Sequence, residues 1–397
     1  MTSEKKNLKC YELILNYNCN AKCAFCSQGS FDKTLNADFD TIARNIYSAY
    51  RAGYRRLGFT GGEPLIRPDI LKIVSLGRSV GFKFIRVQTN GIKLADPDLC
   101  AALVKAGLTF CKFSFTTDSA AAHDGLVGVP GAWRKAVKGI ANLRRLKIRI
   151  GTNILVNKRN YRRLPEIIKS FLEKGITNFV VIYPVYMGSM AANAQKIGVS
   201  LPASEKYFAA SAAVMEKAGL PEEILFLNTP PCFLKGRENL AIGLNLFNTV
   251  VTGPDGKRTD LDATADAAKV YSVACGTCSL KGRCRGVDEN YARILGFKGF
   301  KPVKYDGLAI KEKMSGERGF FSDNERCLAE ILKIKKEVST GEVLKLSKNI
   351  VLCRDCSDGN AVMNSAQKLM KKGYVASRFL KGRFYWSLIK NLPGPDF

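Results

Sequence analysis

Three closely spaced cysteines, Cys19, Cys23 and Cys26, are the residues of this sequence best suited to metal chemistry. They form a C-x3-C-x2-C pattern directly after the first predicted strand. The chain has 13 cysteines and a single histidine, His123, so any metal must be held mainly by thiolates. Structural zinc favours four ligands with no open position. Three thiolates on a four-iron cluster leave one iron free, which is an arrangement suited to catalysis.

A second group of cysteines lies further along the chain. Cys275, Cys278 and Cys284 form a C-x2-C-x5-C pattern, and Cys232 lies upstream of them, across a predicted hairpin. Four cysteines can complete one all-thiolate site. Both zinc and a fully ligated four-iron cluster satisfy that count.

The expected compartment decides how the other cysteines are interpreted. The N-terminal segment MTSEKKNLKC lacks the apolar region of a secretion signal, and no run of about 18 apolar residues predicts a membrane-spanning helix. These features predict a cytoplasmic protein without a disulfide framework. Cys10, Cys100 and Cys111 are therefore expected to be free thiols of the core. Cys327, Cys353 and Cys356 could supply a redox pair, a radical-quenching thiol or ligands to another metal, but unpaired thiols in the core or at the surface are the favoured interpretation.

Two short loops add to the first cysteine pattern. Gly61-Gly62-Glu63-Pro64 follows the second predicted strand, and Gln88-Thr89-Asn90-Gly91 follows the third. With Phe25 before the last cysteine of the first group, this combination resembles the radical S-adenosylmethionine (SAM) superfamily. The resemblance covers roughly residues 8–215.

The resemblance implies two cofactors at the first site, a [4Fe-4S] cluster and SAM. The amino and carboxylate groups of SAM would chelate the open iron. An electron from the cluster would cleave SAM to a 5′-deoxyadenosyl radical, which abstracts a substrate hydrogen. Gly61 and Gly62 would let the backbone approach SAM, Glu63 would accept from its ammonium group, and Phe25 would lie near its adenine. The implied cofactor-binding residues are Phe25, Gly61, Gly62, Glu63, Pro64, Asn90 and Ser114.

The elements that must position these residues alternate between strands and helices. Such alternation predicts an α/β fold with a parallel sheet, and the resemblance specifies a partial (βα)6 barrel over residues 8–218. The predicted strands are Tyr11–Leu15, Arg56–Phe59, Lys83–Gln88, Phe110–Phe115, Lys147–Leu155 and Asn178–Ile182. The predicted helices are Asp38–Ala52, Pro68–Val80, Pro97–Ala106, Ala132–Leu146, Tyr161–Lys174 and Ser204–Ala218. His123 is expected in a loop after the fourth strand, as a structural residue.

Residues 219–310 are predicted to form a small α+β domain. A Pro254-Asp255-Gly256 turn predicts a β-hairpin there, between Leu240–Val251 and the segment that follows. The cysteine pattern after the hairpin resembles the SPASM and twitch extensions of radical SAM enzymes. The full SPASM pattern would need another cysteine at Asp288, so a twitch-like domain with one cluster fits better. The resemblance favours an auxiliary [4Fe-4S] cluster over zinc, held by Cys232, Cys275, Cys278 and Cys284.

Residues 318–397 are predicted to form a winged-helix-like module. The expected helices are Asn324–Val338, Gly341–Ser347 and Gly359–Lys372, followed by a hairpin of Tyr374–Ser377 and Phe384–Leu388. Peptide-modifying radical SAM enzymes often use such a module to hold a leader peptide. A packing or dimerisation module is the alternative interpretation.

The chain carries a formal net charge of +27. Residues 125–165 contain eleven Lys or Arg and no acidic residue. A solvated basic face is the plainest interpretation, and docking of an anionic substrate or RNA is the functional one. The C-terminal module is no more basic than the rest of the chain, so nucleic-acid binding is not favoured.

Together these features predict a radical SAM enzyme that modifies a ribosomally made peptide or protein. Its expected partners are an electron donor such as ferredoxin or flavodoxin and a peptide substrate on the winged-helix module, without membrane insertion. The alternatives are a radical SAM enzyme acting on a sugar, nucleotide, cofactor precursor or RNA, and a zinc-dependent nucleic-acid-binding regulator. The last alternative leaves Gly61-Gly62-Glu63-Pro64 unexplained.

Overall fold

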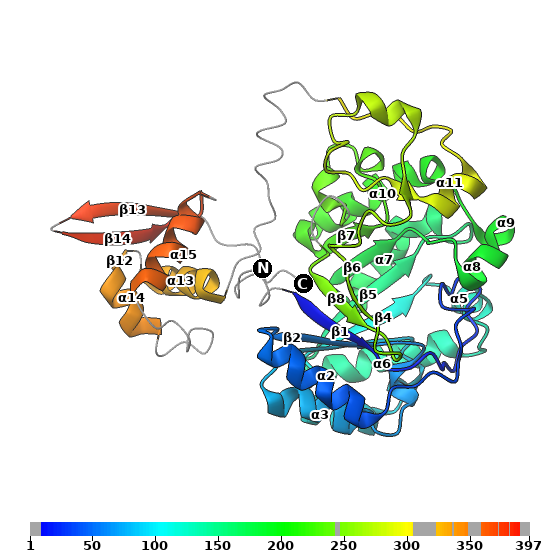
Figure 1. The fold of residues 1–397 in the computed structure, drawn as a ribbon, viewed down its shortest axis with the longest axis horizontal. Helices are drawn as coiled ribbons and strands as arrows, with labels where there is room; N and C mark the ends of the chain where they lie inside the picture. Colours follow the sequence, from blue (N-terminus) through cyan, green and yellow to red (C-terminus); the bar gives the residue numbers. More distant parts are fainter. Residues whose placement is uncertain are drawn as a thin grey trace. The chain divides into compact units, whose positions relative to one another are not determined.

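A nine-stranded sheet organises the first of the two units into which the chain divides, Met1–Ser315 and Gly316–Phe397 (Figure 1). The computed structural model describes residues 9–242, 247–304, 323–335, 337–347, 359–371, 373–380 and 382–389. Seven strands of the sheet run parallel and in chain order: β1 (Cys10–Ile14), β2 (Arg56–Thr60), β3 (Phe84–Thr89), β4 (Phe110–Phe115), β5 (Arg149–Leu155), β6 (Asn178–Ile182) and β7 (Ile224–Leu227). Two more strands, β8 (Thr249–Thr252) and β9 (Arg258–Asp260), extend the sheet beyond β1.

The expected α/β fold is confirmed, and the six predicted strands each lie within two residues of their predicted bounds. The hairpin around Pro254 is formed by β8 and β9, which pair antiparallel. Its first strand begins at Thr249 instead of Leu240, and it joins the main sheet by pairing in parallel with β1. The short apolar strand β7 was not predicted. The segment expected to form a separate second domain therefore contributes three strands to the sheet of the first.

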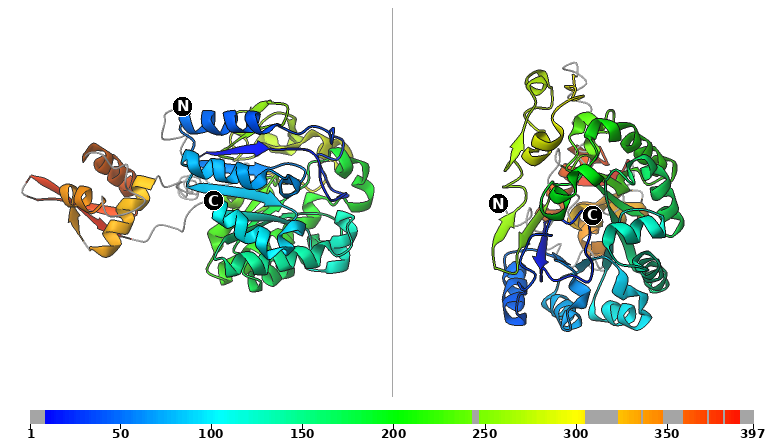
Figure 2. Two further views of the ribbon diagram at one scale, coloured as in Figure 1. Left: turned by 90° about the horizontal axis from the view of Figure 1, so that it is seen from below. Right: turned by 90° about the vertical axis from the view of Figure 1, so that its right-hand side faces the viewer.

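Helices cover the outer face of the curved sheet (Figure 2). The helices of this layer are α2 (Phe39–Arg51), α3 (Ile70–Val80), α4 (Pro97–Ala106), α6 (Ala132–Arg145), α7 (Leu164–Glu173) and α10 (Leu201–Lys217). The described part of this unit also contains α5 (Ala120–Val127), α8 (Gly188–Ala192), α9 (Ala194–Ile197) and α11 (Glu289–Leu295). The six predicted helices are present. Among the helices that the structure describes, none combines the length and the apolar character that a membrane crossing requires.

Helix α2 illustrates how the sequence sets these elements. The Asp38 side chain accepts a hydrogen bond from the backbone N–H of Thr41 and caps the helix N-terminus. Ile42, Ile46 and Ala49 follow at helical spacing and are buried against the sheet. The following connection leads directly into β2.

Helix α5 replaces the loop that was expected around His123. The Ser119 side chain caps its N-terminus. The His123 ring is buried, with Nδ1 3.2 Å from Thr116 Oγ1. Burial lowers the pKa of His123 to about 4, so the ring is neutral at physiological pH. This environment supports the expected structural role of His123.

The inner face of the sheet is polar, because strand side chains alternate between the helices and the barrel interior. Arg86 forms an ion pair with Glu12 on this face. The Lys112 ammonium donates to Asn178 Oδ1 at 2.8 Å, and burial lowers the pKa of Lys112 to about 7. Two residues further along β4, Ser114 lies at the carboxyl end of the strand. Polar side chains therefore continue up to the edge where the site lies.

The second unit contains three helices, α13 (Asp323–Ile334), α14 (Thr340–Ser347) and α15 (Gly359–Lys371). Its antiparallel sheet has the order β12-β14-β13, with bounds Val338–Ser339, Arg383–Leu388 and Val375–Leu380. Trp386 is buried in its core and donates from Nε1 to Thr340 Oγ1 at 3.0 Å. The winged-helix assignment itself remains a prediction.

The prediction of an unpaired thiol at Cys327 was wrong. Cys327 is buried in the core of the second unit and is disulfide-bonded. The predictions for Cys353 and Cys356 lie outside the described residues. Cys10, Cys100 and Cys111 are free and buried, as expected of core thiols.

Candidate active site and second cysteine site

A pocket lies at the carboxyl ends of β1 to β4, where parallel strands bring successive loops to one edge. Every predicted residue of the first site lines it except Glu63 and Pro64. Its lining includes Cys19, Cys23, Phe25, Cys26, Gly61, Gly62, Asn90 and Ser114, together with Lys22, Gln28, Gly29, Lys33, Gln88, Thr89 and Ser189.

Two helices hold the loop that carries Cys19, Cys23 and Cys26. The backbone N–H groups of Lys22 and Ala24 donate to the last carbonyls of α5, with distances of 2.9 Å to Val127 and 2.8 Å to Leu126. The backbone N–H of Ser189, at the start of α8, donates to the Cys26 carbonyl at 2.9 Å. These bonds satisfy backbone groups at both helix ends and fix the loop. Neither helix was predicted from the sequence.

The three thiols of this loop lie close enough to influence one another. Burial, together with the smaller effects of the neighbouring Cys19 and Cys26 thiolates, raises the pKa of Cys23 to about 12. Burial also raises the pKa of Cys19. Neutral thiols are therefore favoured in the protein alone. A bound cationic centre would reverse this preference, because it stabilises thiolate ligands.

The segment that contains Asn16 and Asn18 packs so closely against Gly61 and Gly62 that it leaves no room for a side chain at either position. A side chain at Gly62 would overlap the backbone carbonyl of Asn18, next to Cys19. One at Gly61 would overlap the carbonyl of Asn16, and Gly61 has a positive φ of 150°. The Glu63 N–H donates to Asn18 O at 2.8 Å. The two loops therefore pack backbone to backbone, which only glycine permits.

Glu63 lies behind the pocket wall and is fully buried. Its Oε1 accepts from Thr89 Oγ1 at 2.7 Å and from the Leu65 N–H at 3.0 Å. Its Oε2 accepts from the Asn90 N–H at 2.8 Å. Burial raises the pKa of Glu63 to about 7. The carboxylate thus joins the loop after β2 to the loop after β3, a different set of partners from the ammonium expected from the sequence.

Pro64 and Asn90 have distinct placements. Pro64 is buried at the start of a single 3-10 turn, η1 (Pro64–Ile66), that follows the glycines. The Asn90 side chain donates to Asn20 Oδ1 at 2.7 Å and lies 3.9 Å from Cys19 Sγ. Asn90 therefore contacts the cysteine loop directly.

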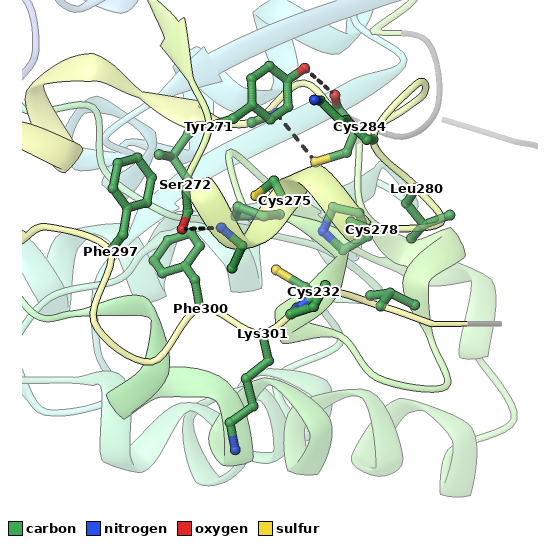
Figure 3. Close-up of a pocket in the computed structure, with 18 of the residues that line it drawn as sticks. Cys232, Tyr271, Ser272, Cys275, Cys278, Leu280, Cys284, Phe297, Phe300 and Lys301 are labelled. Carbon is green, nitrogen blue, oxygen red and sulfur yellow. Dashed lines mark hydrogen bonds between the residues drawn. The ribbon is translucent and has the colours of Figure 1, made fainter.

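The second group of cysteines also converges on one pocket (Figure 3). Cys232 lies in the 3-10 turn η5 (Pro231–Phe233), and Cys275 lies in η7 (Val273–Thr277). Cys278 follows η7, and Cys284 precedes β11 (Val287–Asp288). Burial, together with the smaller effects of Cys284, Cys275 and Cys278, raises the pKa of Cys232 to about 12. The structure thus brings Cys232 to three thiols more than 40 residues away.

The walls of this second pocket are apolar. Phe297 and Phe300 close one side, with ring centroids 5.2 Å apart. The backbone N–H of Gly286 lies 3.3 Å from Cys284 Sγ, and the Tyr271 hydroxyl donates to the Cys284 carbonyl at 2.7 Å. The sulfur of Cys284 therefore already has one backbone donor.

Comparison with known proteins agrees with this geometry. Residues 13–184 match the family described as the radical SAM superfamily. These residues form a radical SAM domain. PqqA peptide cyclase of Gluconobacter oxydans (strain 621H) is 28% identical over 208 residues, which cover 52% of this chain and 58% of that protein. AdoMet-dependent heme synthase of Methanosarcina barkeri (strain Fusaro / DSM 804) is 29% identical over 176 residues, which cover 44% of this chain and 50% of that protein.

The chain spans about half the length of these curated relatives. A solved structure supports the fold over a longer stretch. Streptococcus suis SuiB bound to precursor peptide SuiA has a TM-score of 0.55 and 15% sequence identity, with coverage of 75% of both chains. At this identity the similarity concerns the fold alone.

The residues of the first pocket fit the cluster and SAM that a radical SAM domain uses. Three thiols converge there, and none is in a disulfide. Beside them the wall offers backbone, amide and hydroxyl groups from Gly61, Asn90 and Ser114. Among the described residues, no three His, Cys, Asp or Glu side chains are arranged to hold a single metal ion. The fit therefore rests on the convergence of thiols and on the polar wall beside them.

Several lining residues were missed by the sequence analysis. Ser189 comes from α8, after β6, and the Lys33 ammonium donates to Gln28 O at 2.7 Å within the pocket wall. The Gly188-Ser189 pair follows a strand at its carboxyl end, which is the one signal that could have identified Ser189. Nothing in the local pattern of Lys33 marks it as part of the site.

The Glu63 contacts lead to the first testable prediction. Glu63→Ala leaves three donors without an acceptor, the buried Leu65 N–H and Thr89 hydroxyl and the part-buried Asn90 N–H, and is expected to lower the free energy of unfolding by about 3 kcal/mol. SAM affinity should fall with it, because the loops after β2 and β3 separate. Urea unfolding and equilibrium dialysis of SAM measure the two effects. Glu173→Ala, at an exposed end of α7, is the control. Weaker SAM binding with unchanged stability would instead indicate a direct contact with the ammonium.

Proposed function

We propose that the chain is a radical SAM enzyme that abstracts hydrogen from a peptide or protein substrate. The observation that carries the proposal is the convergence of Cys19, Cys23 and Cys26 with the glycine loop after β2 in one pocket. Bound SAM and a reduced four-iron cluster would supply the 5′-deoxyadenosyl radical there.

The chain's own residues would bind the cluster, orient SAM and shield the site from water. The three thiols hold the cluster and leave one iron open. The polar groups of Asn90 and Ser114 face the space beside it and orient SAM by hydrogen bonds. Phe25 lines the same pocket, where it would pack against the adenine and help to exclude water. Glu63 acts as a positioning residue, because it fixes the two loops that carry these groups.

The substrate class is supported by two relatives and by the second unit. One similar protein is named a peptide cyclase, and one solved structure is described with a bound precursor peptide. In the second unit, helices and strands follow the order α13, β12, α14, α15, β13, β14, which supports the proposed winged-helix module of residues 318–397. A leader peptide would bind to this module by strand addition, with ferredoxin or flavodoxin as the electron donor.

An auxiliary [4Fe-4S] cluster is proposed for the second pocket. Four converging thiols and apolar walls support it, and the Gly286 N–H adds a donor to one of the sulfurs. This pocket belongs to the proposed twitch-like domain of residues 219–310, which follows the barrel domain of residues 8–218.

The test is release of 5′-deoxyadenosine by the reconstituted protein with SAM and dithionite, stimulated by extract from its own organism. We expect stimulation that exhaustive protease treatment of the extract abolishes. Stimulation that survives protease would contradict the peptide proposal. Nuclease treatment and size filtration would then separate RNA from a small molecule, the class of substrate expected for a relative named as a heme synthase.

A further inference from the structure

Basic side chains surround the second cysteine pocket. Residues 269–304 carry eight Lys or Arg and two Asp or Glu, more than twice the average density of net positive charge along the chain. Lys281 and Lys301 line the pocket and are exposed, and Arg283 and Arg285 flank Cys284 and are partly exposed. These four residues are called the basic rim below. Figure 3 shows that the Lys301 side chain extends away from the sulfurs.

Acidic groups offset little of this charge. Among the described residues, Arg285 of the rim forms an ion pair with Asp266, at 2.8 Å. Asp266 is itself largely exposed, so this pair lies in water and contributes little. The rim therefore presents a positive surface around the pocket.

Two apolar side chains lie in solvent beside the same cysteines. Val273 is 99% exposed and precedes Cys275 by two residues. Tyr271 is 41% exposed, and its hydroxyl is tied to the Cys284 carbonyl. Protein–protein interfaces commonly have an apolar core and a polar rim.

The position of the thiols makes this surface suitable for electron transfer. Cys275, Cys278 and Cys284 are all partly exposed. A cluster held by them would lie close to the surface, and electron transfer requires close approach of donor and acceptor. The first pocket, in contrast, must close around SAM and substrate. A partner on the basic rim would leave that pocket free.

The chemistry of the surface favours a protein over a nucleic acid. The rim charges would attract both. An exposed valine, however, offers neither a stacking platform for bases nor a donor for phosphates. It does offer apolar area to a folded protein with an acidic surface.

We propose that the basic rim, together with Val273 and Tyr271, docks an acidic one-electron carrier protein that reduces the auxiliary cluster. This inference rests on the proposed function, because it assumes that the four cysteines hold that cluster. In the step, the reduced carrier loses one electron and the oxidised cluster gains it. No bond forms or breaks, and no proton moves.

Stopped-flow reduction of the reconstituted protein by a reduced flavodoxin, with a plant-type ferredoxin as second probe, tests the proposal. The variant combines Lys281→Glu with Arg283→Glu. At low salt we expect its second-order rate of cluster reduction to fall about tenfold, with a flatter dependence on salt. Calorimetric titration with oxidised flavodoxin should show a matching loss of affinity. Val273→Asp should slow reduction as well, and its exposure makes a folding defect unexpected.

The control variant reverses two exposed charges on α2, Arg44→Glu and Arg51→Glu, which lie on another element. Its rate of reduction by flavodoxin should equal that of the unchanged protein. Dithionite should reduce the unchanged protein and every variant equally. Equal slowing by both double variants would overturn the docking site. The docking site would also be overturned if the Lys281→Glu, Arg283→Glu variant were reduced at an unchanged rate but lost binding of single-stranded RNA. The iron content reports separately on the proposed function, because a chain without the auxiliary cluster holds about four irons instead of eight.

Discussion

Replacing Cys19, Cys23 and Cys26 together by Ala is expected to leave about four irons per chain and to abolish 5′-deoxyadenosine formation. The unchanged protein should hold about eight irons after anaerobic reconstitution. The loss is expected to be complete because these three thiols line the pocket and no other cysteine in the described part of the chain does. Their loop is held by backbone bonds to α5 and α8, which the substitutions leave in place, so the fold should persist.

Iron analysis, Mössbauer spectroscopy and chromatography of the products measure this result. Cys111→Ala is the matched control, because it removes a free, buried thiol of β4 that does not line the pocket. That control should retain both clusters and SAM cleavage. Loss of all iron in the triple variant would show that the second cluster does not exist. Retained 5′-deoxyadenosine formation would contradict the assignment of the first site.

The parts of the site that could be predicted are those encoded by local sequence. The spacing of Cys19, Cys23 and Cys26 fits within one loop, and apolar runs bounded by turn residues predict the strands before and after it. Parallel strands then force the loops to one edge. Sequence alone therefore suffices to bring the cysteine loop, the glycine loop and Asn90 together.

The parts that could not be predicted depend on contacts between distant segments. Strand β8 pairs with β1 across more than 230 residues, and no local period encodes that choice. Helix α5 is short and weakly patterned, yet its last carbonyls hold the cysteine loop. The reason for Gly62 also differs from the expected one. Its space is taken by the Asn18 carbonyl, which the sequence does not place beside it.

Glu63 shows the same limit at one side chain. An acidic residue in a cofactor loop suggests contact with a cationic ligand. In the structure the carboxylate accepts from Thr89 and from the backbone of Asn90 and is fully buried, while its contact with an ammonium group stays a prediction. A buried carboxylate needs several donors, and the loop after β3 supplies them. The position of a loop can thus be predicted while the direction of its side chain cannot.

Replacing Cys275 and Cys278 by Ser is expected to remove about four irons while the SAM-binding cluster remains. Both residues lie in or beside one short 3-10 turn, so the substitutions remove two ligands from one side of the pocket. Cys232 and Cys284 alone cannot complete a four-thiolate site. The main sheet should keep its stability, because η7 contributes no strand to it.

This variant should still cleave SAM with dithionite, because the first pocket is intact, but substrate modification should stop. Electron paramagnetic resonance of the reduced protein should lose one of two cluster signals. Metal analysis decides between the two all-thiolate possibilities, because a zinc site would give about four irons and one zinc in the unchanged protein. That result would contradict the auxiliary cluster and, with it, the docking of an electron carrier on the basic rim. Normal substrate modification by the variant would instead restrict the second site to a structural role.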